Sequence, residues 1–177
     1  MPLIEHGHLH YGENKIQEAI DKWSDIRLKD SDIKLHLIGR LQTNKVKFAL
    51  RIFDYIHSLD SEKLANKISE EQLKQNKKPK LFIQVNIGNE DQKSGINKDN
   101  LVDFYKFCKN LNLDIIGTMC IPPNEGNVEK YFSEMSDLNK ELNFKELSMG
   151  MSGDYLEAIR YNATYVRVGS KIFGSRS

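Results

Sequence analysis

Short apolar runs alternate with longer amphipathic stretches along the whole chain. An uninterrupted apolar run such as Leu81-Phe82-Ile83 is typical of a strand that is buried on both faces. The apolar runs predict seven strands, at Leu9–Tyr11, Lys34–Ile38, Tyr55–Ser58, Leu81–Asn86, Ile115–Met119, Glu146–Ser148 and Thr164–Val168. The amphipathic stretches predict helices at Lys15–Ser24, Asn44–Ile52, Ser61–Gln75, Lys98–Asn110, Val128–Leu142 and Gly153–Tyr161.

Strands that alternate with helices at this spacing predict βαβ units around a parallel sheet. No linker or low-complexity segment interrupts them, so we expect a single domain over residues 1–177. A doubly wound open sheet can have seven strands, whereas a TIM barrel has eight. Met1 to Gly7 has the pattern of a helix end, with Gly7 as the stop signal. A helix end followed by seven strands predicts an α/β fold, a TIM (β/α)8-type barrel that lacks its first strand and is incomplete at the N-terminus.

Composition narrows the function classes. The chain has 177 residues, of which 39% are hydrophobic and 29% charged, the balance of one ordinary globular domain. A formal net charge of +1 gives no reason to expect nucleic acid or a membrane surface as partner, and no apolar run is long enough to span a bilayer. Cys108 and Cys120 match no metal or disulfide spacing, so we expect buried free thiols and a cytoplasmic location.

The loops after the last two predicted strands indicate an anion site. A phosphate in a TIM barrel is typically held by the loops after strands seven and eight. Ser152-Gly153 and Gly169-Ser170 lie at these places. Glycine lets the backbone approach an anion, and serine adds a hydroxyl donor. Helix capping by Ser152 is a compatible alternative.

Arg167 lies inside an apolar strand, where a guanidinium is costly unless an acceptor meets it. The acceptor could be a ligand at the barrel mouth or an internal carboxylate such as Glu13, and both interpretations stay open. Asn14 and Gln17 resemble a capping pair, which makes helix capping the simpler role for Asn14.

Histidines are unusually placed, but none indicates catalysis by itself. His36 and His57 lie in or beside strands, where a histidine is more often a hydrogen-bonded core residue than a catalyst. His6, His8 and His10 alternate into the first predicted strand without a carboxylate at a metal-ligand spacing. We therefore expect neither a metal site nor a catalytic histidine.

Seven fragments, in order along the chain, resemble the pyridoxal 5′-phosphate (PLP) homeostasis proteins, which are similar in fold to the N-terminal barrel of alanine racemase. Two of them lie in the last third of the chain, Leu147 to Asp154 (LSMGMSGD) and Val166 to Gly174 (VRVGSKIFG). The others are Tyr11 to Glu18 (YGENKIQE), His36 to Lys45 (HLIGRLQTNK), His57 to Asp60 (HSLD), Gln84 to Asn86 (QVN) followed by Lys93 to Gly95 (KSG), and Gly117 to Pro122 (GTMCIP).

The resemblance implies a PLP site at the carboxyl ends of the strands. Members of the family bind PLP covalently through a lysine at the end of strand one. The resemblance also implies that Arg167 faces the pyridine nitrogen and keeps it unprotonated, which weakens the electron sink that PLP enzymes use. The cofactor-binding residues expected from it are Asn14, Ser148, Ser152, Gly153, Arg167, Gly169 and Ser170.

This chain departs from the family pattern at its start. Met1 aligns inside the helix that follows strand one, so we expect the covalent lysine in the missing N-terminal segment. Lys15, Lys45 and Lys171 are predicted on helices or turns outside the site. The expected function is PLP binding in intracellular homeostasis, without catalytic residues or turnover. PLP-accepting apoenzymes are further candidate partners.

Two alternatives stay open. An amino-acid racemase needs an acid/base residue on each face of the substrate Cα, and this chain has neither the lysine nor the second domain that serve alanine racemase. The second alternative is that the chain is an inactive truncated fragment of the family. The strand edges that a missing strand leaves open predict a monomer or a weak homodimer.

Overall fold

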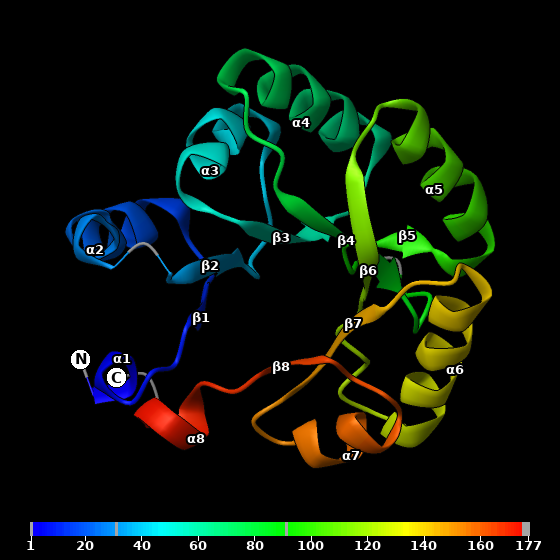
Figure 1. Cartoon of the computed structure of the whole chain (residues 1–177). Coiled ribbons are helices and arrows are strands. Elements are labelled where there is room, and N and C mark those ends of the chain that lie inside the picture. Colours follow the sequence, from blue (N-terminus) through cyan, green and yellow to red (C-terminus); the bar gives the residue numbers. More distant parts are fainter. Residues whose placement is uncertain (1, 31, 91, 175–177) are drawn as a thin grey trace.

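The computed structural model describes residues 2–30, 32–90 and 92–174. Figure 1 shows a ring of strands with the helices outside it. The strands are all parallel and lie in the order β1-β2-β3-β4-β6-β7-β8, with the short β5 paired to β4. Their bounds are β1 His10–Glu13, β2 Lys34–Leu37, β3 Tyr55–Leu59, β4 Lys80–Asn86, β5 Ile96–Asn97, β6 Asp114–Met119, β7 Glu146–Met151 and β8 Tyr165–Arg167.

Each strand of the ring is followed by a helical segment. The bounds are α1 Pro2–Glu5, α2 Ile16–Lys29, the 3-10 turn η1 Thr43–Lys45, α3 Val46–Ile52, α4 Glu62–Gln75, η2 Lys98–Asn100, α5 Leu101–Asn110, α6 Val128–Glu141, α7 Tyr155–Arg160 and α8 Ser170–Phe173. Right-handed βα units of this kind place every carboxyl strand end on one face of the ring. The predicted alternation of strands and helices is confirmed.

Several details differ from the prediction, as three examples illustrate. Helix α2 continues to Lys29 instead of ending at Ser24, because Arg27 in its last turn reaches Ile52 and Asp54. Strand β7 extends to Met151, beyond the predicted end at Ser148. The two-residue β5 was not predicted, since a strand this short has no periodicity to recognise.

The chain enters the barrel through the predicted helix end. Helix α1 stops at Glu5, and Gly7 adopts a positive φ of 79° while its N–H donates to the Ile4 carbonyl at 2.8 Å. A left-handed residue of this kind is the usual C-terminal stop of a helix, and glycine adopts it without strain. The stop signal at Gly7 is confirmed.

The ring of strands has one open seam, between β8 and β1 (Figure 1). These strands are the two ends of the pairing order, and no ladder joins them within the described residues. Across the seam, the His10 and Tyr165 rings lie 6.1 Å apart, centroid to centroid. The barrel with seven ring strands agrees with the predicted fold.

The interior of the ring is aromatic and polar. Tyr55, Phe82 and Met119 form a buried cluster, against which Tyr165 packs. TIM barrel interiors are more often filled with Val, Ile and Leu. Here the aliphatic residues pack mainly between the strands and the surrounding helices. A polar interior leaves room for hydrogen bonds between side chains of distant strands.

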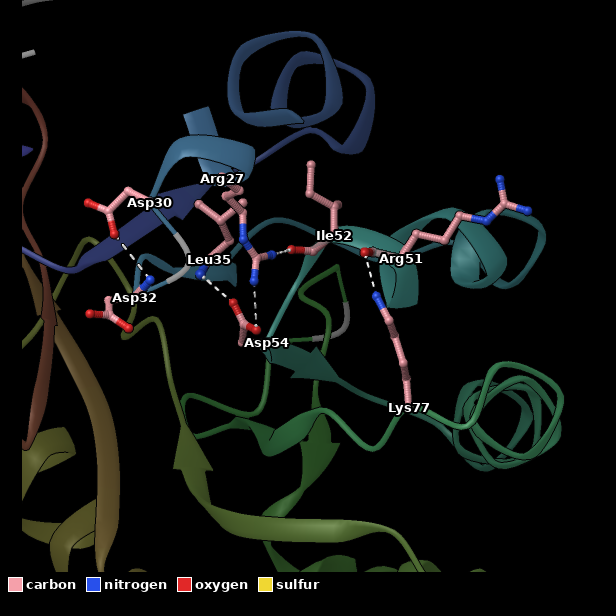
Figure 2. A network of polar contacts seen from close by, with 8 residues as sticks. All are labelled: Arg27, Asp30, Asp32, Leu35, Arg51, Ile52, Asp54 and Lys77. Atoms are coloured by element: carbon pink, nitrogen blue, oxygen red, sulfur yellow. Dashed lines mark hydrogen bonds and ion pairs between the residues drawn. The ribbon is translucent and has the colours of Figure 1, made fainter. Parts of the chain in front are cut away.

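The amino ends of the strands are held by a charged network (Figure 2). Arg27 of α2 donates to Asp54 Oδ1 at 3.1 Å and to the Ile52 carbonyl at the end of α3. Asp54 Oδ2 accepts from the Leu35 N–H of β2 at 2.8 Å. One carboxylate and one guanidinium thus tie two helices to two strands.

Candidate functional site

The carboxyl ends of β6, β7 and β8 meet around Arg167. Its Nη1 donates to Ser148 Oγ of β7 at 2.8 Å, and its Nη2 donates to the Cys120 carbonyl after β6 at 2.8 Å. Both acceptors are neutral. Desolvation lowers the pKa of the Arg167 guanidinium, while the nearby Cys120 and Asp154 act in the opposite direction. Arg167 is therefore a half-buried cation that no carboxylate contacts within the described part of the chain.

The alternative that Arg167 pairs with Glu13 is wrong. Glu13 Oε1 accepts from Trp23 Nε1 at 2.7 Å and from Lys22 Nζ at 2.9 Å, both on α2. Successive side chains of a strand point to opposite faces. His10 of the same strand points into the ring, so Glu13, three residues later, points out toward the helices.

The two Ser/Gly loops are joined to each other. Ser152 Oγ accepts from the Gly169 N–H at 3.2 Å, a contact between residues 17 positions apart. The alternative that Ser152 is a helix N-cap is wrong, because α7 begins at Tyr155 and Asp154 is its N-cap residue. Ser170 starts α8 directly after Gly169 and is exposed. The loops after β7 and β8 thus form one surface next to Arg167 at the end of β8.

The glycines of this surface leave the backbone open. A Cβ placed on Gly153 or on Gly169 would meet no atom within 4 Å. Gly150 differs, since its φ is +89° and a Cβ there would lie 2.6 Å from the Ala158 Cβ. Gly150 is thus required by the protein's own packing. Gly153 and Gly169 are not, and they leave space beside their N–H groups for another molecule.

Asn14 lies between β1 and α2 and is exposed. The predicted capping pair with Gln17 is wrong, because Lys15 is the N-cap residue, no side chain caps the helix, and Gln17 Nε2 donates to Asp21 at 3.0 Å. The Asn14 backbone packs against the loop after β2, where a Cβ on Gly39 would lie 2.2 Å from the Asn14 carbonyl oxygen. No described hydrogen bond joins Asn14 to Arg167.

A chain of histidines leads from Arg167 through the interior of the ring, and sequence reasoning missed it. His57 Nδ1 lies 2.8 Å from Ser148 Oγ, His57 Nε2 lies 2.9 Å from His36 Nδ1, and His36 Nε2 lies 2.9 Å from His10 Nδ1. His36 and His57 are 4% and 1% exposed, which confirms them as core residues. Their link to the site could have been found only from the pairing of the strands.

Burial keeps these rings neutral. Desolvation, aided by His10, lowers the pKa of His36 to about 3. Desolvation lowers the pKa of His57 well below its ordinary value, with His36 and Arg167 acting in the same direction. The pKa of His10 is also lowered, mainly by desolvation. Neutral imidazole has one donor and one acceptor nitrogen, so each ring can link two neighbours.

Other kinds of site receive little support. No group of His, Cys, Asp and Glu in residues 2–30, 32–90 and 92–174 could hold a metal ion. None of the helices in the same ranges is long and apolar enough to cross a membrane. Lys15 pairs with Glu18, and Lys171 Nζ lies 4.8 Å from the Tyr155 ring centroid. Neither lysine contacts the Arg167 cluster.

A groove of about 900 Å³ lies at the opposite face of the ring, between the amino ends of β2, β3 and β4. Its lining includes Arg27, Asp54 and Lys80. In (β/α)8 barrels the amino-terminal face stabilises the fold, and ligands bind at the carboxyl-terminal face. The Arg167 cluster, at the carboxyl-terminal face, is therefore the better candidate.

The family model described as "Alanine racemase, N-terminal domain" matches residues 1–177. The pyridoxal phosphate homeostasis protein of Aquifex aeolicus (strain VF5) is 41% identical over 176 residues, covering 94% of this chain and 76% of that protein. The protein of the same name from Pasteurella multocida (strain Pm70) is 35% identical over 181 residues, covering 96% and 78%.

Solved structures agree with these relatives. PipY of Synechococcus elongatus PCC7942, whose structures include one with PLP bound and one without, is 32% identical with a TM-score of 0.88 over 98% of this chain and 85% of that chain. An alanine racemase of Clostridium difficile 630 is 15% identical with a TM-score of 0.73, over 98% of this chain and 47% of the other, and shows the shared fold alone. The chain belongs to the pyridoxal phosphate homeostasis protein family, within the group of barrels that resemble the alanine racemase N-terminal domain.

Proposed function

We propose that this protein binds PLP at the carboxyl ends of its strands and acts in intracellular PLP homeostasis without catalytic turnover. The observation that carries the proposal is Arg167, a half-buried cation held only by neutral acceptors, beside two joined Ser/Gly loops. The names of the relatives and the PLP-bound structure of PipY support the identity of the ligand.

The residues present fit the two ends of PLP. The phosphate is held by the loop residues Ser152, Gly153, Gly169 and Ser170, and the space beside the two glycines admits it. Backbone N–H groups and hydroxyls are the donors that phosphate prefers when it meets a turn of this kind. Ser152 accepts from Gly169 in the ligand-free chain, so its hydroxyl holds the two loops together before the anion arrives.

Arg167 meets the ring of PLP. When bound, PLP supplies an electrophilic aldehyde and an electron-withdrawing pyridine ring. A guanidinium can only donate hydrogen bonds, so a pyridine nitrogen that accepts from Arg167 has its lone pair free and carries no proton. Ser148 and the Cys120 carbonyl hold the guanidinium on its other side. Asn14, on the loop after β1, contributes near the ring.

The groups near Arg167 support the proposed absence of turnover. Racemisation needs an acid/base group on each face of a substrate carbon. The groups that contact Arg167 are a hydroxyl and a carbonyl, and the adjacent histidine has a pKa well below neutrality. Deuterium exchange at the Cα of either alanine enantiomer, in heavy water with PLP, should not exceed that of free PLP. Faster exchange would favour the racemase alternative.

The bound state is non-covalent in this chain. Lys15 pairs with Glu18, Lys45 lies in η1 near the Phe48 ring, and Lys171 lies over the Tyr155 ring. The expected absorbance is that of the free aldehyde. Borohydride reduction followed by mass spectrometry tests this, and a stoichiometric pyridoxyl adduct on one lysine would contradict it.

Further parts of the proposal concern assembly and location. Residues 1–177 form one PLP-binding domain, and the unpaired edges of β1 and β8 favour a monomer or a weak homodimer. Cys108 and Cys120 are free and buried, and burial raises the pKa of each thiol to about 12, which suits a reducing cytoplasm. PLP-accepting apoenzymes are the proposed recipients.

The direct test of the site is a structure of the protein with PLP. The phosphate should contact Ser152, Gly153, Gly169 or Ser170, and the pyridine nitrogen should face Arg167. Phosphate density at the groove near Arg27 instead would overturn the proposed site while leaving PLP binding intact.

A further inference from the structure

Three histidines cross the interior of the ring, from His10 at the amino end of β1 to Ser148 in β7. His10 lies in β1, His36 in β2 and His57 in β3, and each is within 2.9 Å of the next group in the series that ends at Ser148. Stacking holds two of the rings in place, His36 on Tyr55 at 4.1 Å and His57 on Phe82 at 4.2 Å between ring centroids. None of the PLP-binding roles proposed above uses these three histidines.

Only one direction of the hydrogen bonds between Ser148 and the three histidines gives every described donor an acceptor. Arg167 has no acceptor atom, so Ser148 Oγ accepts from it. Ser148 Oγ has His57 as its single other described partner, and its own hydrogen is satisfied only by donation to His57 Nδ1. A neutral His57 then carries its hydrogen on Nε2 and donates to His36 Nδ1. By the same rule His36 donates from Nε2 to His10 Nδ1, and His10 carries its hydrogen on Nε2.

This direction has an electrostatic consequence for the guanidinium. Each ring turns its lone pair toward Arg167 and its N–H away from it, so the negative ends of three ring dipoles and one hydroxyl dipole face the cation. Aligned side-chain dipoles act as fixed partial charges, and hydrogen bonds in series polarise one another. The interior of the ring is poorly solvated, which strengthens both effects. These dipoles add to the longer-range effect of Asp154 on the half-buried guanidinium, which no carboxylate contacts in the described part of the chain.

We infer that His10, His36 and His57 form a neutral, oriented chain that serves as the counter-dipole of Arg167, and that His57 is a positioning residue for it through Ser148. An Asp or Glu in this place would neutralise Arg167 and compete with a ligand for its N–H groups. The three histidines stabilise the charge of Arg167 but leave its N–H groups available to the ligand. The ligand part of this inference rests on the proposed function, whereas the hydrogen-bond direction does not.

The direction can be read in the ligand-free protein. Long-range ¹⁵N–¹H correlation spectra distinguish the two neutral tautomers of each histidine from the charged form. At pH 7 we expect His10, His36 and His57 all neutral with the hydrogen on Nε2. A hydrogen on Nδ1 of His36 or His57, or a charged ring at either position, would overturn the inference. Ser148→Ala removes the hydroxyl that orients His57, and we expect its Nδ1–H form to become populated.

The positioning role is tested with two variants of one residue. His57→Asn keeps an oxygen acceptor close to the Nδ1 position, whereas His57→Leu has similar bulk and no acceptor. We expect PLP affinity to fall about tenfold in His57→Leu, the factor for one lost hydrogen bond in a charged cluster, and to stay within about threefold in His57→Asn. Equal affinity in folded wild-type and His57→Leu protein would overturn the positioning role.

Folding is controlled separately. Near-ultraviolet circular dichroism and thermal melts show whether His57→Leu is native, and if it is not, Ser148→Ala replaces it in the affinity series with the same expected tenfold loss. If the wild-type chain does not bind PLP, the proposed function fails, while the tautomers in the ligand-free protein still decide the hydrogen-bond direction. The two failures are therefore distinguishable.

Discussion

Each end of the barrel holds an arginine, and the two arginines have different hydrogen-bond partners. Arg27 at the amino ends of the strands meets the Asp54 carboxylate and a backbone carbonyl (Figure 2). Arg167 at the carboxyl ends meets a hydroxyl and a backbone carbonyl. The charge of Arg27 is paired within the fold, and that of Arg167 is not. One face thus uses its arginine to hold elements together, and the arginine of the other face is the one that we propose binds PLP.

The energetic cost of leaving Arg167 without a contacting carboxylate explains the polar interior of the ring. A desolvated guanidinium without a carboxylate is unfavourable unless dipoles surround it. Ser148, the Cys120 carbonyl and the histidine chain supply such dipoles. The Arg27 side chain and its partner are 25% and 30% exposed, and their ion pair needs no such support.

Acid should have the largest effect, because it acts on the buried histidines that lead to Arg167. The pKa of His36 in the folded state is about 3, below the ordinary 6.5, so the unfolded chain takes up a proton that the native chain excludes. Stability from this group is complete above pH 6.5 and is lost as pH falls toward 3. The loss is about 1.4 kcal/mol per pH unit, or roughly 3 kcal/mol at pH 4.5, and His57 adds to it in the same direction.

Urea unfolding at pH 7 and pH 4.5 measures this loss. The matched control is His36→Asn, which cannot titrate and should lose less stability between the two values. An equal loss in both proteins would mean that carboxylates at other places, and not the interior histidines, govern acid unfolding.

Arg167→Ala should have the next largest effect, on binding. We expect PLP affinity to fall roughly a hundredfold, the range for a lost hydrogen bond and charge contact to a ligand, measured by fluorescence titration. The free energy of unfolding should change less than the 3–5 kcal/mol expected for a broken buried ion pair, because both acceptors are neutral. A large fall in stability with unchanged PLP affinity would assign Arg167 to the fold.

Arg27→Ala should lower stability without weakening PLP binding. The substitution leaves Asp54 and the Ile52 carbonyl without their donor, and we expect a loss of about 1–2 kcal/mol in the free energy of unfolding. PLP affinity should stay at the wild-type value, since the residue lies at the other end of the barrel. Weaker PLP binding by this variant, with the protein folded, would show that the two ends are coupled.

The smallest expected effect is that of Gly169→Ala. The added methyl meets no protein atom within 4 Å, so stability should stay within about 0.5 kcal/mol of wild type. The methyl group would occupy the space beside the loop after β8, where we propose that the phosphate binds. We expect PLP affinity to fall roughly fivefold. Gly150→Ala is the contrasting variant, because its positive φ and the nearby Ala158 Cβ predict a loss of stability. Unchanged PLP affinity in Gly169→Ala would move the phosphate away from this loop.

The sequence by itself determined the layers of this protein and the place of its candidate site. The alternation of apolar runs with amphipathic stretches specified parallel strands and outer helices, because burial on both faces of a strand needs continuous apolar residues. The Ser/Gly pairs at 152–153 and 169–170 predicted which face would be the candidate ligand face, since every carboxyl strand end of a parallel barrel lies on one face. Local patterns carry this information, and local patterns are visible in a sequence.

Tertiary structure alone decided which of these residues meet. His57 and Ser148 are 91 positions apart and Arg167 and Cys120 are 47 apart, and strand order and register bring each pair within 2.8 Å. The tertiary structure also turned Glu13 outward toward Trp23. It placed Ser152 Oγ where it accepts from the Gly169 N–H instead of capping a helix. A hydrogen bond requires a geometry of a few tenths of an ångström, and only the closed packing of distant strands sets positions that finely.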